Sequence, residues 1–141
     1  MSAFSNYLEL KIAQWTTGSA MGTAPANLYI GLFSATPNED GTGGTEVTTA
    51  LIGNATRPTI TLTAATVNDI TTLKNPANFV FVASAAGAAN VTHFAIYDTA
   101  TGNTPGTNNM LYKGAITNGP KAVAATDEVR FNANSFVITI D

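Results

Sequence analysis

The 141-residue chain contains no cysteine, which excludes disulfide bonds, thiolate nucleophiles and cysteine-based zinc sites. It also lacks any apolar run approaching the roughly 20 residues that a membrane-spanning helix requires. The N-terminus has no basic region followed by an apolar stretch, so we expect no signal peptide. These absences predict a protein that is made in a cytoplasm and does not enter a membrane.

Charged side chains are scarce, at 11% of the sequence against about 25% in an ordinary soluble domain. The net charge is −3, and the six lysines and arginines are scattered singly, so the basic cluster that nucleic-acid binding requires is missing. In place of charge the chain has 23 threonines and 14 asparagines, residues suited to strand faces and turns. A neutral surface of this kind loses little free energy when another protein desolvates it.

The N-terminal segment carries a helical pattern. Apolar side chains follow one helical face at spacings of four, four and three, namely Phe4, Leu8, Ile12 and Trp15. Asn6 and Glu9 have the spacing of a capping box, and glycines at 18 and 22 end the pattern. The stripe has two interpretations, packing against the core, which we favour, and a docking arm that contacts a neighbouring subunit.

From residue 27 the hydrophobic period changes to two. Residues 28–33 read as a strand covered on both faces, and 35–50 as a long exposed loop. Further strand candidates are 56–63, 79–83, 91–97, 110–117 and 135–140, separated by turn-forming segments at 68–78, 98–109 and 117–128. We predict a mainly β fold, an antiparallel β-sandwich or barrel-like fold with one N-terminal α-helix. It forms a single domain, 1–141, with a helix or arm at 1–17 and the β-sandwich at 27–141.

The single histidine, His93, is the strongest catalytic candidate, with Asp98 five residues later. Residues an odd number apart point to opposite faces of a strand, and Asp98 is better suited to capping the turn that follows. Neither a GxSxG elbow nor another nucleophile context accompanies the histidine. We therefore predict that the protein is not an enzyme and that His93 lies on a sheet face, bonded to a neighbour.

Other chemical signatures are weak. The GTGGTE segment at 41–46 has the glycines of a phosphate loop but lacks the lysine that follows them in a nucleotide site. Glu39, Asp40 and Glu46 lack the spacing of a calcium loop, which leaves only a weak adventitious cation site as an alternative. Arg57 and Arg130 lie in strand candidates, where an arginine pairs with a carboxylate or with backbone carbonyls. We predict no catalytic, cofactor or metal site.

Several segments occur in a characteristic order along nearly the whole chain. They are NLYIGLFSATPNEDGTGGTEV, NATRPTITLT, VTHFAIYDTATGN, MLYKGAIT and a final FVITID. This ordered set resembles a family of small virion proteins of tailed bacteriophages. Two departures stand out. Ala55 replaces the tyrosine of the family's Y-x-R strand, and TPGTNN lengthens the turn after Asp98.

The resemblance implies a structural role in the virion. We favour a capsid decoration or cement protein, which binds the outer head surface as a homotrimer, ties subunits of the major capsid protein together and stabilises the shell. The alternative is a tail-associated or tail-fibre protein with a structural or receptor-binding role. The expected partners are the major capsid protein and other copies of the chain, without nucleic acid, membrane or cofactor. The candidate contact residues are Phe4, Tyr7 and Trp15 in the N-terminal segment and Pro37, Glu39, Asp40, Glu46 and Val47 in the following loop.

Overall fold

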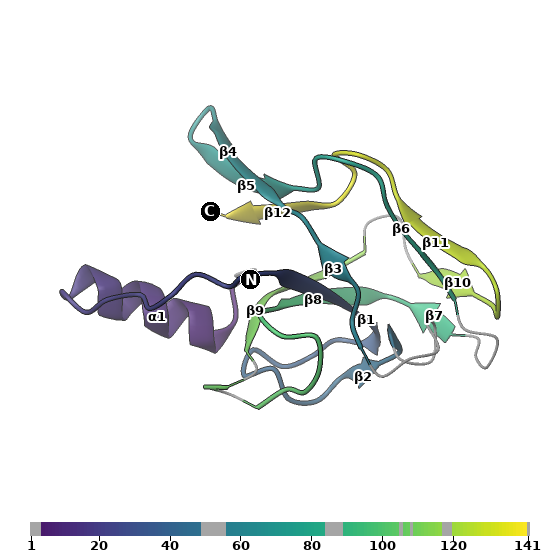
Figure 1. Cartoon of the computed structure of the whole chain (residues 1–141), viewed down its shortest axis with the longest axis horizontal. Coiled ribbons are helices and arrows are strands. Elements are labelled where there is room, and N and C mark those ends of the chain that lie inside the picture. The colour runs from purple at the N-terminus through teal and green to yellow at the C-terminus, as the bar shows by residue number, and fades with distance from the viewer. Residues whose placement is uncertain are drawn as a thin grey trace.

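The computed structural model describes residues 4–48, 56–83, 89–104, 106–107, 109–116 and 120–140. Within these residues the chain is mainly β, with one helix near the N-terminus and several antiparallel sheets (Figure 1). The predicted fold class is therefore confirmed. The sheets stay open, and no closed barrel forms among the described strands.

The elements follow one another along the chain with short strands throughout. They are α1 (Asn6–Thr16), β1 (Leu28–Ala35), β2 (Thr45–Glu46), β3 (Thr59–Ile60), β4 (Thr63–Val67), β5 (Ile70–Lys74), β6 (Phe79–Val82), β7 (Ala89–Val91), β8 (His93–Tyr97), β9 (Met110–Ala115), β10 (Lys121–Val123), β11 (Glu128–Phe131) and β12 (Val137–Ile140).

The central sheet has the order β2-β1-β8-β9, and β3 also pairs with β1. β1 and β8 run antiparallel in a register that places Ile30 opposite Ile96 and Leu32 opposite Phe94. These side chains point to one face, where they form the main core together with buried residues of the smaller sheets such as Val91. Alternation along the strand therefore buries one apolar face, as the period of two predicts.

The opposite face of the central sheet holds a second, smaller cluster, which consists of Phe33, Ala95, Tyr97 and Met110 with Tyr29 at its edge. Phe33 and Tyr97 are 2% and 1% exposed. Both faces of β1 are thus covered, which confirms the prediction for residues 28–33.

Two strands lie in segments that the sequence predicts to be turns. β5 occupies part of 68–78 and pairs with both β4 and β12, while β10 occupies part of 117–128 and pairs with β7. In the first case the turn itself is only two residues long, because Asn68 and Asp69 adopt positive φ angles of 50° and 64°. Neither strand shows a clear alternation of apolar and polar side chains, since β5 reads ITTLK and β10 has only three residues, KAV.

Candidate protein-interaction surface

The helix α1 is anchored to the body through its N-terminal end. The backbone N–H of Ser5 donates to the carbonyl of Leu111 at 3.0 Å, and the N–H of Asn6 donates to the carbonyl of Glu39 at 2.9 Å. Just before the helix, the rings of Phe4 and Tyr112 lie 5.7 Å apart. These contacts fix the point at which the helix leaves β9 and the loop after β1.

The N-cap of α1 is Ser5, so the predicted capping by Asn6 is wrong. Ser5 has extended backbone angles, and its hydroxyl accepts a hydrogen bond from the N–H of Leu8 at 3.3 Å. The same hydroxyl donates to the carbonyl of Met110, and the residue is 1% exposed. Because the residue that caps the helix is also bound to β9, the start of α1 is held against the sheet.

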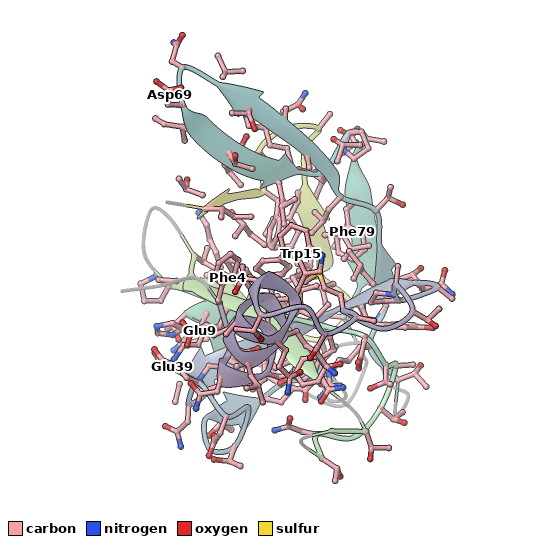
Figure 2. The ribbon with its side chains drawn as sticks, turned by 90° about the vertical axis from the view of Figure 1, so that its left-hand side faces the viewer. Phe4, Glu9, Trp15, Glu39, Asp69 and Phe79 are labelled. Carbon is pink, nitrogen blue, oxygen red and sulfur yellow. The ribbon has the colours of Figure 1, made fainter. Side chains whose placement is uncertain are left out.

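The rest of α1 projects from the body (Figure 1), and no residue of the helix is buried. Leu10 is 56% exposed and Trp15 is 61% exposed. The favoured interpretation, that the whole aromatic stripe packs against the core, is therefore wrong. Phe4, which precedes the helix, contacts the sheet through the ring of Tyr112. In Figure 2 the helix is seen nearly end-on, with Glu9 and Glu39 on one side and Trp15 on another.

The loop after β1 is held by internal bonds. Pro37 is fully buried, and its carbonyl accepts a hydrogen bond from Nζ of Lys113 at 3.1 Å. The same ammonium lies 3.8 Å from the carboxylate of Glu39. Asp40 accepts bonds from the N–H and the hydroxyl of Thr42, and these bonds lower the pKa of Asp40. The loop thus has a defined shape although most of its side chains are exposed.

The helix and this loop together line a groove of about 420 Å³. From the helix come Tyr7, Leu10 and Lys11, and from the loop come Glu39 and Asp40. The structure therefore brings together the two segments that the sequence singles out as contact candidates. The remaining candidates take different places. Trp15 lies outside the groove, and Pro37, Glu46 and Val47 are used within the fold.

Glu46 belongs to a cluster of contacts around the buried side chain of Arg57, called the polar lock below, which also includes Gly102 and Tyr97. Its carboxylate receives two bonds from the guanidinium, Nε to Oε1 at 2.8 Å and Nη2 to Oε2 at 2.7 Å. Nη1 of Arg57 donates to the carbonyl of Gly102 at 2.8 Å, and the guanidinium carbon lies 3.5 Å from the ring centre of Tyr97. Arg57 is 6% exposed. The predicted pairing of Arg57 with a carboxylate and with backbone carbonyls is confirmed.

The lock gives Tyr97 an unusual environment. Burial raises the pKa of its hydroxyl to about 12, although the positive charge of Arg57 works in the opposite direction. Ala55, the departure from the family's Y-x-R strand, lies outside the described residues.

His93 and Asp98 do not form a pair. Nε2 of His93 lies 2.6 Å from the hydroxyl of Thr36, and Nδ1 lies 2.8 Å from the hydroxyl of Thr92. Asp98 instead accepts bonds from the backbone N–H and the side-chain amide of Asn109 at 2.7 and 2.8 Å. It thus closes the turn after β8, as predicted.

His93 also borders a pocket of about 440 Å³, and the described residues that line it include Lys113 but no carboxylate. Within the described ranges, no three histidine, aspartate or glutamate side chains gather as metal ligands would. The one described helix is too short to cross a bilayer.

A family model described as podophage GP4 fiber I protein gp80 matches residues 3–139 of the chain. The chain belongs to this family. It is thus a bacteriophage structural protein and part of the virion, which confirms the general resemblance to phage virion proteins. The family is of fibre type and gives no support to capsid decoration over the tail-fibre alternative. None of the curated proteins matches the chain.

Proposed function

We propose that the protein is a structural subunit of a fibre on the phage particle and that α1 attaches it to a neighbouring virion protein. The observation that carries the proposal is the family match over residues 3–139. The projecting helix supports it, because a helix without buried residues gains little from its own body and leaves its apolar side chains for a partner.

Trp15 supplies the largest apolar contact that α1 can offer. An aromatic side chain buries about 150–250 Å² when it is fully covered. Covering the exposed 61% of Trp15 would therefore remove on the order of 100 Å² from water. At about 25 cal/mol per Å² this burial contributes about 2.5 kcal/mol, or roughly 70-fold in affinity.

The experiment is incorporation of Trp15→Ala protein into particles that lack the wild-type chain, measured as copies per particle by quantitative mass spectrometry. We expect a large loss of incorporation at limiting protein concentration. Val82→Ala is the matched control, because Val82 is 60% exposed but lies on β6. Equal incorporation of both variants at wild-type level would refute attachment through α1.

Capsid decoration is the second candidate function, and the low charge of the surface favours it as much as it favours a fibre. Such a protein would contact the major capsid protein at many equivalent sites, where weak contacts add through effective concentration. Gold labelling of a tagged chain in electron micrographs separates the two locations. Label on fibres supports the proposal, whereas label spread over the head in proportion to the major capsid protein overturns it.

We also infer that the protein binds and does not catalyse. The hydrogen bonds of His93 to two threonine hydroxyls support this role, because a general base needs a partner that holds and activates it. His93→Ala should leave particle infectivity unchanged at wild-type protein levels. Loss of infectivity by particles that carry a full complement of folded variant would contradict this inference.

A further inference from the structure

The strand β4 forms an exposed sheet edge without protection. It is the outer strand of the sheet β12-β5-β4, and all five of its residues are exposed. Its sequence, TAATV, contains neither a charge nor a proline, the devices that usually keep an edge strand from pairing with another chain. The hairpin β4–β5 also extends away from the body, with Asp69 at its tip (Figures 1 and 2).

The other outer strands of the described fold either carry charged residues or are shorter than β4. β9 carries Lys113 and is bound along its edge by Ser5, β10 begins with Lys121, and β11 carries Glu128 and Arg130. β6 and β12 are uncharged but have four residues each. The residues of β12 also line a pocket together with β9, which places that edge against the body.

The turn of the hairpin determines which backbone groups β4 presents. A two-residue turn makes Val67 and Ile70 a hydrogen-bonded pair, so Ala65 and Thr63 also bond to β5. Thr66 and Thr71 then form a pair without backbone bonds, where side chains approach more closely. Their hydroxyls indeed lie 2.8 Å apart. The N–H and C=O groups of Ala64 and Thr66 therefore point away from β5, toward solvent.

We propose that β4 pairs antiparallel with β4 of a second copy of this chain, centred on Ala65. In this register Ala64 of one copy faces Thr66 of the other, and these are the residues whose backbone groups point outward. Each such pair exchanges both of its hydrogen bonds, so the contact gains about four. The side chains that meet are small or β-branched and carry no charge, so the edge is complementary to itself.

The pairing also covers apolar side chains that the single chain leaves in water. Val67 is 65% exposed, and in the paired sheet it lies opposite Thr63 of the partner. The two three-stranded sheets become one continuous sheet across a twofold axis. This contact joins chains in pairs, in contrast to the homotrimer expected from the resemblance, and it does not depend on where in the virion the protein lies.

The absence of cysteine from the chain allows a direct test with single cysteine variants. In the proposed register the two Ala65 residues form a pair without backbone bonds, with their Cα atoms about 4.5 Å apart, which a disulfide can bridge. Ala65→Cys protein should therefore form a covalent dimer under mild oxidation. Thr72→Cys is the control, because Thr72 pairs with Ala65 on β5 and would lie about 14 Å from its copy.

Dimer on a non-reducing gel for the Ala65 variant and monomer for the Thr72 variant would support the proposal. Equal cross-linking of both variants, or of neither, would overturn it.

A second measurement uses the native backbone bonds. Sedimentation of the wild-type chain should give twice the 14.5 kDa chain mass. Ala64→Pro removes an outward N–H without removing a bond to β5, and it should give the monomer, whereas Ala64→Ser should remain dimeric. Circular dichroism of each variant establishes that it is folded. A wild-type mass of one or three chains, or a dimer of folded Ala64→Pro protein, would refute the pairing.

Discussion

The two arginines of the chain offer a matched pair of substitutions that tests the polar lock, Arg57→Ala and Arg130→Ala. Arg57 is 6% exposed, and its guanidinium makes two bonds to Glu46 and one to the carbonyl of Gly102. Removing one partner of a buried ion pair leaves the other charge without compensation and costs about 3–5 kcal/mol. For a chain of this length that cost lowers the melting temperature by roughly 10–15 °C.

Arg130 should behave differently although its residue type is the same. Its contact with Glu128 is longer, 3.7 Å, and the two side chains are 52% and 55% exposed. An exposed pair of this kind contributes about 0–1 kcal/mol, because water screens the charges. We expect Arg130→Ala to shift the melting temperature by less than about 3 °C.

The assay is thermal unfolding followed by circular dichroism, with urea unfolding to obtain free energies. A second comparison distinguishes the loss of one charge from the loss of the whole ion pair. Arg57→Ala leaves the carboxylate of Glu46 unpaired, and the double variant Glu46→Leu/Arg57→Leu removes both charges. The double variant should be more stable than Arg57→Ala. If Arg57→Ala and Arg130→Ala had the same melting temperature, the lock would not be a stabilising element and the argument from burial would be wrong.

Three further predictions follow from single side chains or glycines. Between pH 10 and 12 an unfolded tyrosine ionises while Tyr97 in the folded chain stays protonated, so stability falls as pH rises. Tyr97→Phe should lose about 1.4 kcal/mol less than wild type between pH 9 and pH 11 in urea unfolding, and an equal loss would argue against the raised pKa. Ser5→Ala removes the cap and its bond to β9, and it should cost about 1–2 kcal/mol in the same assay, whereas the exposed Ser135→Ala should cost less. Gly44 has a φ of 68°, and a Cβ there would lie 2.9 Å from backbone atoms, so Gly44→Ala should destabilise more than Gly106→Ala, which has a positive φ but open space. Equal effects of the two glycine variants would show that the loop relaxes around the new methyl group.

Hydrophobic periodicity predicts which faces of a helix or strand are apolar, but it does not predict what covers those faces. The pattern at residues 28–33 correctly predicts a strand covered on both faces, because apolar side chains at both parities leave no face for water. The spacing of apolar residues in the N-terminal segment likewise predicts the helix but not its exposure. A stripe of Leu8, Ile12 and Trp15 has the same spacing whether its cover is the chain's own core or another protein.

The polar contacts were likewise predictable only in part. The sequence indicates that Arg57 is paired, since an arginine in a buried strand needs a partner, and Glu46 fills that role. It cannot indicate which carboxylate is used, because that choice depends on the pairing of β1 with both β2 and β3. The sequence did not predict the hairpin β4–β5, because its large apolar side chains, Val67, Ile70 and Leu73, do not follow a period of two.

Several of the few charged side chains in the chain have partners within the fold. Arg57 with Glu46, Lys113 with Glu39, and Asp98 with Asn109 all tie loops to strands within the fold. The projecting elements keep two charges each, Glu9 and Lys11 on α1 and Asp69 and Lys74 on the hairpin. They also present the apolar side chains of Trp15, Leu10 and Val67 to solvent. A contact centred on these exposed apolar side chains would desolvate few charges, so its desolvation penalty would be small. Paired charges thus stabilise the body, and the exposed apolar side chains of α1 and the hairpin are the ones that the proposed contacts would cover.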